Sequence, residues 1–318
     1  MNRISTDLQQ AKSILENDNL VAIPTETVYG LAGNAFSEKA IKKIFETKNR
    51  PLFNPLIVHI HSKELLNDIA TEIPEKAYQL TNAFWPGSLT LVLKKKNNIP
   101  DLVTAGKSTV AVRVPNHSLT LSLLRLLDFP LVAPSANPFG SISPTSAEHV
   151  ANYFKDNLPL ILDGGTCENG IESTIIGFEG EEPIVYRLGA VSVEEVEAVV
   201  GKVNIKNSKE ATPEAPGMLL RHYAPKTKTI LTNDIDGFIN NNHSKNIGTL
   251  TFYKKFTSCN VKHQEILSEQ RNYKEAATNL YQAMHRLDQM NLDLIVAERF
   301  PDENLGKSIN DRLTRATK

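Results

Sequence analysis

The chain has 318 residues, enough for two ordinary domains at roughly 100–200 residues each, or for one large α/β domain. Hydrophobic residues make up 41% and charged residues 22%, as in globular proteins with a sizeable core, which excludes wholesale disorder. Lys and Arg number 35 against 36 for Asp and Glu, a net charge of −1. The chain therefore lacks the basic excess of a protein that coats nucleic acid.

The compartment is indicated by cysteine content and by the first residues. Only Cys167 and Cys259 are present, which argues against a disulfide framework or a cysteine zinc cluster. Residues 1–19 are polar and lack the apolar core of a signal peptide, and no apolar run approaches the ~18 residues of a membrane span. We expect a soluble, cytoplasmic protein with two free thiols. His59 and His61 lack further metal ligands, so we expect no transition-metal site.

Helix and strand patterns alternate up to about residue 203. Apolar residues at helical spacing predict helices over residues 4–15, 37–48, 62–70, 74–84, 119–127, 146–154 and 193–200. Short apolar runs predict strands over residues 20–24, 56–60, 89–93, 109–114, 131–133, 173–177 and 184–188. Some strands follow one another without an intervening helix, so a mixed sheet is favoured over a purely parallel one.

A linker and a second α/β pattern follow. Residues 204–226 contain three prolines and little periodicity, which is typical of a linker. Met218, Leu219, Leu220 and Tyr223 are too apolar for an idle tether, so we expect this segment to dock. Strands over 229–232, 247–253 and 294–297, with helices over 273–290 and 305–316, predict a small Rossmann-like three-layer domain. The predicted organisation is an α/β domain over 1–203, a linker over 204–226 and a small C-terminal α/β domain over 227–318.

The common nucleotide and hydrolase motifs are missing. Two Gly-Lys-Ser triplets, at residues 106–108 and 306–308, resemble the end of a P-loop but lack its upstream glycine. The sequence has no GxGxxG and no GxSxG. The site therefore has to be sought in less familiar patterns.

Four polar segments remain unusual, at residues 24–31, 48–55, 134–145 and 216–225. The first and third follow strands, where α/β proteins usually bind ligands. Lys48 and Arg50 can present two cations to one polyanion, and Ser135 and Asn137 lead toward a helix N-terminus that can cradle phosphate. Each segment also has a plainer interpretation: a capped turn, a solvated helix end, an ordinary turn or an interdomain spacer.

Together these segments resemble one family. PTETVYGL, KNRP, STVAVRVP, APSAN, ESTII and YRLGA are similar to the YrdC-type domain. PGMLLRHYAP, followed by an α/β tail, resembles the long, two-domain form of the threonylcarbamoyl-AMP synthases. The resemblance implies a YrdC-like twisted mixed-sheet domain, followed by a linker and the small α/β domain. It also implies a nucleotidyltransferase that joins L-threonine, bicarbonate or CO2 and ATP into L-threonylcarbamoyladenylate, releasing pyrophosphate.

The resemblance further implies partners. Mg2+ is expected to come with ATP, and the product is expected to feed the threonylcarbamoyl-adenosine modification of tRNA. Downstream transfer proteins would use the adenylate, so direct tRNA binding is expected to be weak or absent. We expect no membrane partner.

Site residues follow from the same resemblance. The catalytic quartet, assigned to the ATP phosphates, is Lys48, Arg50, Ser135 and Asn137. Further ATP contacts are implied at Asn54, Thr109, Ser143, Arg187 and Tyr223, the last serving as a lid that excludes water. The threonine contacts implied are Thr27, His59, Arg113, Ser173 and the main chain of Ala133. The general base is not identified: His59 is a candidate, or merely a ligand of threonine.

Several alternatives stay open. Arg113 could be a solvent-facing arginine of its strand. The chain could instead be a double-stranded RNA or tRNA-binding module, a carbamoyl-transfer enzyme, or a regulatory protein dominated by its tail. If the chain is instead a synthase of the family that it resembles, removing residues 227–318 should harm activity less than removing everything from Pro216 onward.

Overall fold

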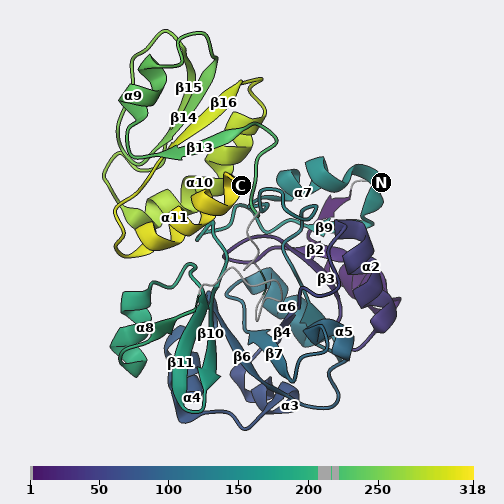
Figure 1. The fold of residues 1–318 in the computed structure, drawn as a ribbon. Helices are drawn as coiled ribbons and strands as arrows, with labels where there is room; N and C mark the ends of the chain where they lie inside the picture. The colour runs from purple at the N-terminus through teal and green to yellow at the C-terminus, as the bar shows by residue number, and fades with distance from the viewer. Residues whose placement is uncertain (1–2, 207–215, 217–221) are drawn as a thin grey trace.

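The computed structural model describes residues 3–206, 216 and 222–318, which form two α/β units, each with its own sheet (Figure 1). The N-terminal unit is built on a large twisted sheet, and the C-terminal unit on a small one. Within these ranges no helix is both long and apolar enough to cross a membrane.

The sheet of the N-terminal unit has mixed strand directions. Its strands are β1 (Ile4–Ser5), β2 (Val21–Ile23), β3 (Gly30–Asn34), β4 (Ile57–His59), β5 (Ala70–Thr71), β6 (Leu89–Lys95), β7 (Thr109–Arg113), β8 (Leu131–Val132), β9 (Leu160–Leu162), β10 (Thr174–Glu179), β11 (Glu182–Arg187) and β12 (Asn204–Ile205). They pair in the order β1-β9-β2-β3-β8-β4-β7-β6-β10-β11-β12, with β5 on β6. β4 pairs with β7 in parallel and β6 with β7 antiparallel, so the predicted mixed sheet is confirmed.

Helices cover this sheet, and α1, α2, α7 and α8 begin at a side-chain cap. They are α1 (Leu8–Glu16), α2 (Glu38–Lys48), α3 (Leu66–Ile69), α4 (Glu75–Phe84), α5 (Asp101–Thr104), α6 (Ser118–Leu126), α7 (Ala147–Phe154) and α8 (Val193–Val200), with 3-10 turns η1 (Lys63–Leu65) and η2 (Lys155–Asn157). Asp7, Ser37, Ser146 and Ser192 each accept a hydrogen bond from an N–H of the first helical turn.

The structure corrects some of the predicted elements. The helix predicted over 4–15 begins only at Leu8, because Asp7 caps it and residues 4–5 pair with β9 instead. The sequence patterns also missed β3, β5, β9, β12 and α5. These elements have two to five residues, too few to display a period of 2 or 3.6.

The C-terminal unit is a three-layer sandwich, as predicted. Its strands β13 (Thr229–Thr232), β14 (Ile247–Thr251), β15 (Val261–Ile266) and β16 (Leu294–Glu298) are all parallel, in the order β13-β16-β14-β15. Helix α9 (Ile235–Asn240) packs with Ile247 and Val296 on one face. Helices α10 (Tyr273–Asp288) and α11 (Leu305–Ala316) pack with Leu250 and Ile295 on the other. The sequence patterns had missed α9 and β15.

The two units share an apolar interface. Val28, Ile142 and Ile171 of the N-terminal unit belong to the same buried cluster as the α10 and α11 residues. Gly170 (φ +67°) approaches α10 so closely that a Cβ there would lie 2.3 Å from the carbonyl oxygen of Thr278. The two units pack so closely at this point that only glycine fits there.

Only part of the predicted linker can be described. The expectation that Met218, Leu219 and Leu220 dock onto a surface falls outside the described residues. The main-chain N–H of Ala224 donates to the carbonyl of Gly140 at 2.8 Å, and Tyr223 is buried with 1% of its surface exposed. This end of the segment is therefore packed against the folded units.

Candidate active site

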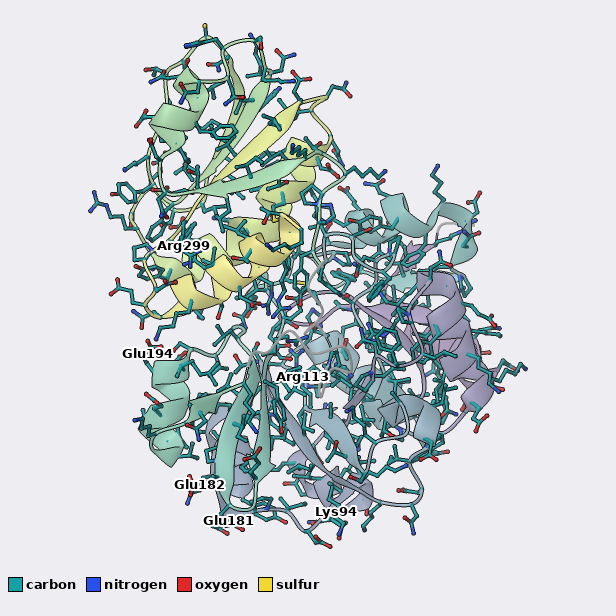
Figure 2. All side chains as sticks on the ribbon, in the orientation of Figure 1. Lys94, Arg113, Glu181, Glu182, Glu194 and Arg299 are labelled. Atoms are coloured by element: carbon teal, nitrogen blue, oxygen red, sulfur yellow. The ribbon has the colours of Figure 1, made fainter. Side chains whose placement is uncertain are left out.

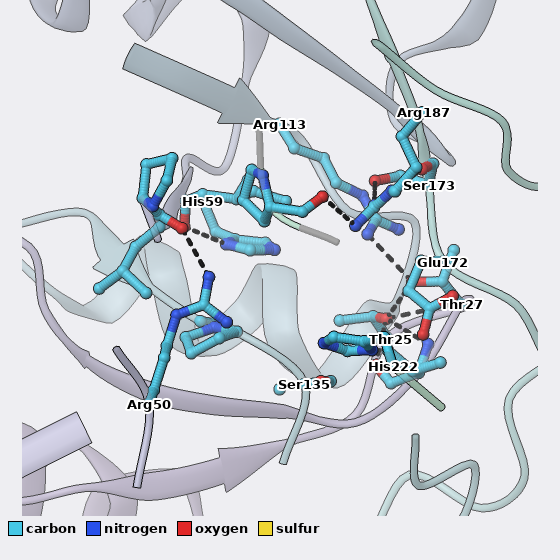
Figure 3. A pocket seen from close by; sticks show the side chains of 18 of the residues that line it. Thr25, Thr27, Arg50, His59, Arg113, Ser135, Glu172, Ser173, Arg187 and His222 are labelled. Atoms are coloured by element: carbon cyan, nitrogen blue, oxygen red, sulfur yellow. Dashed lines mark hydrogen bonds between the residues drawn. The ribbon is translucent and has the colours of Figure 1, made fainter. Parts of the chain in front are cut away.

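A narrow pocket lies in the N-terminal unit beside the C-terminal one (Figure 3). His59 and Arg113 end the adjacent parallel strands β4 and β7 and are direct partners in register. Their side chains therefore meet at the carboxyl edge of the sheet, where α/β proteins bind ligands. The predicted residues that line the pocket are Thr27, Arg50, His59, Arg113, Ala133, Ser135, Ser173, Arg187 and Tyr223.

Arg113 anchors one end of the pocket. Figure 2 shows it near the middle of the molecule, whereas Lys94, Glu181 and Glu182 lie at the periphery. It is 4% exposed, so the alternative of a solvent-facing arginine is wrong. Its guanidinium donates to the Thr27 hydroxyl at 3.0 Å and to the Glu26 carboxylate at 2.5 Å. A guanidinium has five N–H donors, so it can still donate to a ligand carboxylate.

Glu26 holds Arg113 in place, and the sequence patterns did not single it out. Its carboxylate also accepts from the Ser88 hydroxyl and from the main-chain N–H of Asn116, both at 3.0 Å. A carboxylate with several donors stays oriented and keeps its partner oriented. Its place inside the PTET segment was the available signal.

His59 is held as a neutral hydrogen-bond acceptor. Its Nδ1 lies 3.1 Å from the carbonyl oxygen of Ile57, so Nδ1 carries the proton and Nε2 is left as an acceptor. Burial, reinforced by the charge of Arg113, lowers the pKa of His59 to about 3. Such a weak base is poorly suited to deprotonating an amine at neutral pH, so the geometry favours a ligand-positioning role.

Three further buried cations lie in the pocket wall or directly behind it. The Arg50 guanidinium donates to the carbonyl of Pro55 at 2.7 Å, and Arg187 donates to the carbonyl of Ser173 at 2.8 Å. Lys48 donates to the carbonyls of Ser135 and Asn137. All three hold carbonyls, and within the described ranges none is ion-paired with a carboxylate.

This arrangement leaves Lys48 and Arg50 without a carboxylate partner among the described residues, while Glu172 lies near Arg187. Burial lowers the pKa of Lys48, Arg50 and Arg187 from their ordinary values. Repulsion adds to this, from Arg50 on Lys48 and from Arg187 on Arg50. A polyanionic ligand would raise these pKa values again, because an opposite charge nearby favours the charged form of each cation.

Buried polar atoms without partners gather in the same region. They are Nδ2 and Oδ1 of Asn54, Oδ1 of Asn137, Nδ1 of His222 and the hydroxyl of Tyr223. Buried polar groups are normally hydrogen-bonded, so unpaired ones point to a missing water or ligand. His222 and Tyr223 line the pocket directly.

Five predicted residues do not line the pocket. Lys48 and Asn137 lie behind Ser135, Asn54 lies beside Arg50, and the Ser143 hydroxyl donates to Glu172 at 2.6 Å. Thr109 begins β7, four residues before Arg113 and therefore about 13 Å from it along the strand. The structure thus brings the phosphate-site motifs together but leaves Thr109 apart from the pocket.

Glu172 and His222 line the pocket although the sequence patterns did not select them. Glu172 directly precedes Ser173 in ESTII, and His222 precedes Tyr223, so both had a signal by adjacency. Burial raises the pKa of Glu172, but the nearby charges of Arg312 and Arg187 outweigh it and hold this pKa below its ordinary value. Within the described ranges, no group of three or more His, Cys, Asp or Glu side chains is arranged to hold a metal ion.

Comparisons with known proteins agree with this geometry. A family described as "Telomere recombination" (Sua5, YciO and YrdC) matches residues 13–189. A second, described as "Threonylcarbamoyl-AMP synthase, C-terminal domain", matches residues 191–317.

Relatives match over nearly the whole length. The threonylcarbamoyl-AMP synthase of Pyrococcus abyssi is 40% identical, covering 96% of this chain and 93% of that protein. The Bacillus subtilis enzyme of the same name is 38% identical, covering 97% and 92%. The crystal structure of P. abyssi Sua5 complexed with L-threonine superposes with a TM-score of 0.91, at 39% identity, covering 98% of this chain and 94% of that one. The chain therefore belongs to the threonylcarbamoyl-AMP synthase family, with both the YrdC-like unit and the C-terminal domain of its two-domain members.

Proposed function

We propose that this protein synthesises L-threonylcarbamoyladenylate from L-threonine, bicarbonate or CO2 and ATP, releasing pyrophosphate, for the threonylcarbamoyl-adenosine modification of tRNA. The observation that carries the proposal is one pocket whose wall combines two kinds of group. Arg113 with neutral His59 suits an amino acid, and carbonyl-held cations suit a polyphosphate. The naming of near full-length relatives supports the same reaction.

The threonine assignment is supported by matching groups. Arg113 offers donors to the carboxylate, and Nε2 of His59 can accept from the hydroxyl or the amine. Thr27, Ser173 and the main chain of Ala133 complete this wall. The related P. abyssi Sua5 was crystallised with L-threonine, which supports the same ligand here.

The ATP assignment rests on charge. Arg50, Arg187 and Lys48 lack carboxylate partners among the described residues, so a triphosphate would supply the missing anions. Ser135 lines the pocket, and Asn54, Asn137 and Tyr223 carry unpaired polar atoms for a ligand or its waters. Mg2+ would be bound by the nucleotide and water, as its reluctance to dehydrate allows.

Two bond-forming steps give the product. The threonine amine attacks the carbon of bicarbonate or CO2, forming an N–C bond and a carbamate as the amine loses its proton. With bicarbonate, a hydroxide also leaves the carbon and departs as water. A carbamate oxygen then attacks the α-phosphorus in line, and the bond to pyrophosphate breaks. Positioning and charge neutralisation by the pocket would supply most of the acceleration.

Pyrophosphate release by the purified protein tests the proposal. We expect release only when ATP, L-threonine and bicarbonate are all present, with the adenylate identified by mass spectrometry. Release that does not require both threonine and bicarbonate would refute the reaction.

RNA binding is the alternative outcome of a second assay. The cations of the pocket are buried, with Arg50 7% and Arg187 4% exposed, so they are poorly placed to contact an RNA duplex. Tight, salt-sensitive binding of tRNA without ATP would favour the RNA-binding alternative. The proposal instead predicts weak tRNA binding, with transfer to tRNA made by other proteins.

A further inference from the structure

Two helices of the C-terminal unit reach the wall of the pocket through Glu172. Arg312 of α11 donates from Nε to Oε2 of Glu172 at 2.7 Å, and the Tyr281 hydroxyl of α10 donates to the same oxygen at 2.9 Å. The other oxygen of Glu172 accepts from the hydroxyl of Ser143 at 2.6 Å. One carboxylate lining the pocket is therefore fixed by side chains from both units.

Arg312 is the largest fully buried side chain of the described residues, with 0% of its surface exposed. It also donates to Asp311 and to the carbonyl of Leu188, both at 2.7 Å. Burying a guanidinium is costly unless it is paired and hydrogen-bonded on every side. Such a complete set of partners indicates that its position is specified by the fold.

The same guanidinium supports Tyr223. Its Cζ lies 4.9 Å from the centre of the Tyr223 ring. The rings of Tyr223 and Tyr281 are stacked, with their centres 5.8 Å apart. Tyr223 has a backbone φ of +63°, a conformation that non-glycine residues adopt only when their surroundings hold them there. Its ring lines the pocket, so Arg312 contacts two residues of the pocket wall from behind.

Contacts between the units keep this support in place. The Thr278 hydroxyl donates to the carbonyl of Glu168 at 2.6 Å, and Nε2 of His285 lies 3.2 Å from the carbonyl of Ser143. Ser143 is thus held through its hydroxyl by Glu172 and through its carbonyl by α10.

We infer that Arg312 is a positioning residue of the active site, through which the C-terminal unit neutralises Glu172 and fixes Tyr223 for nucleotide binding. The inference rests on the proposed function. Without Arg312, only Arg187 among the described residues would offset the charge of Glu172, and the carboxylate would repel the triphosphate more strongly, because like charges in a buried site disfavour each other. The C-terminal unit would then be part of the binding site for ATP, although none of its residues need touch the nucleotide.

The test compares two variants with a matched control. Arg312→Met removes the charge and keeps an unbranched side chain, and we expect the KM and Kd for ATP to rise about tenfold or more, with a smaller change in the KM for threonine. Arg286→Met is the control: it removes a guanidinium that donates to Glu265 at 2.7 Å and 2.8 Å on the exposed side of α10. It should leave ATP affinity within twofold of the unaltered protein.

A double variant separates charge neutralisation from general damage. In Glu172→Gln/Arg312→Met the repelling carboxylate is gone, so we expect most of the ATP affinity to return, as measured by isothermal titration calorimetry. An unchanged ATP affinity in the single variant, or no recovery in the double variant, would overturn the inference.

If Arg312→Met does not fold, Glu172→Gln alone still tests the inference. That variant removes a negative charge beside the phosphates, so ATP should bind at least as tightly as before, and weaker binding would count against the inference. Calorimetry reads nucleotide binding alone, so failure of the proposed reaction would be recognised separately by the pyrophosphate assay.

Discussion

Lys48 and Asn137 lie 89 residues apart in the chain, yet the ammonium of Lys48 donates to the main-chain carbonyl of Asn137. A second hydrogen bond joins Lys48 to the carbonyl of Ser135. The lysine at the end of α2 therefore holds the loop that follows β8. In this geometry Lys48 supports Ser135 from behind, while Arg50 and Ser135 line the pocket.

Replacing Lys48 should therefore cost both stability and activity. Lys48→Ala leaves the buried carbonyl of Asn137 without its donor, at about 1–3 kcal/mol, and leaves the carbonyl of Ser135 with only the main-chain N–H of Asn137, so we expect the melting temperature to fall by several degrees. The loop bearing Ser135 would shift, and pyrophosphate release should fall by about tenfold or more. Lys42→Ala is the control, because Lys42 is exposed on the same helix and, among the described residues, its side chain bonds to Glu38 alone, at 3.2 Å. A Lys48→Ala protein with normal activity and stability would contradict this role.

Arg113 should govern threonine affinity more than ATP affinity. Arg113→Lys keeps a positive charge beside Glu26 but loses the planar fork that also reaches Thr27 and the carbonyl of Gly87. We expect the KM for threonine to rise about tenfold or more and the KM for ATP to change little, in steady-state assays. Arg125→Lys, on the exposed side of α6, is the control. A larger effect on ATP than on threonine would show that Arg113 serves the nucleotide instead.

The stacked histidines between the two units predict loss of stability in acid. The rings of His149 and His285 lie 3.8 Å apart, one from each unit. Burial lowers the pKa of His285 to about 4 and that of His149 to about 3. A histidine whose pKa is lowered by folding makes its full contribution to the stability of the fold above its ordinary pKa of 6.5. That contribution is lost as the pH falls below 6.5. For His285 the loss between pH 6.5 and pH 5 is up to about 2 kcal/mol.

Thermal unfolding at pH 7.5 and pH 5.0 measures this loss. We expect the melting temperature of the unaltered protein to fall at the lower pH, and His285→Gln to show a smaller fall. His263→Gln is the control, because His263 is exposed on β15. If the melting temperature falls by the same amount in all three proteins, the protonation of these rings is not the cause of the acid sensitivity.

The longer elements could be predicted from the sequence because their patterns are local. The strand over 229–232 and the helix over 305–316 have the bounds that the sequence pattern indicated. β9 could not be predicted in this way, because its three residues gain their strand conformation only by pairing with β1 and β2. Whether these residues form a strand therefore depends on contacts with residues that are far away in the sequence.

The site was predictable in part for the same reason. Motifs after strands pointed to Arg50, His59 and Arg113, which meet because β4 and β7 are neighbours. Arg312 was not among the predicted site residues, since its role depends on the docking of two units and on Glu172, 140 residues away. The expectation that the C-terminal domain matters less than the linker also came from motifs alone. Buried contacts from Tyr281 and Arg312 now lead us to expect a strong loss of activity when it is removed.

Binding of ATP should take up protons, because burial and mutual repulsion lower the pKa of the cations in and behind the pocket wall. Burial, with repulsion from Arg50, lowers the pKa of Lys48 well below its ordinary value. A bound triphosphate would raise this pKa again, so Lys48 should gain a proton as ATP binds. Calorimetric titration of Mg-ATP at pH 8.5, where the nucleotide itself is fully ionised, in two buffers of different ionisation enthalpy measures the uptake. We expect the binding enthalpy to differ between the buffers for the unaltered protein and much less for Lys48→Met. Equal enthalpies in the two buffers for the unaltered protein would mean that Lys48 is already fully charged before the nucleotide arrives.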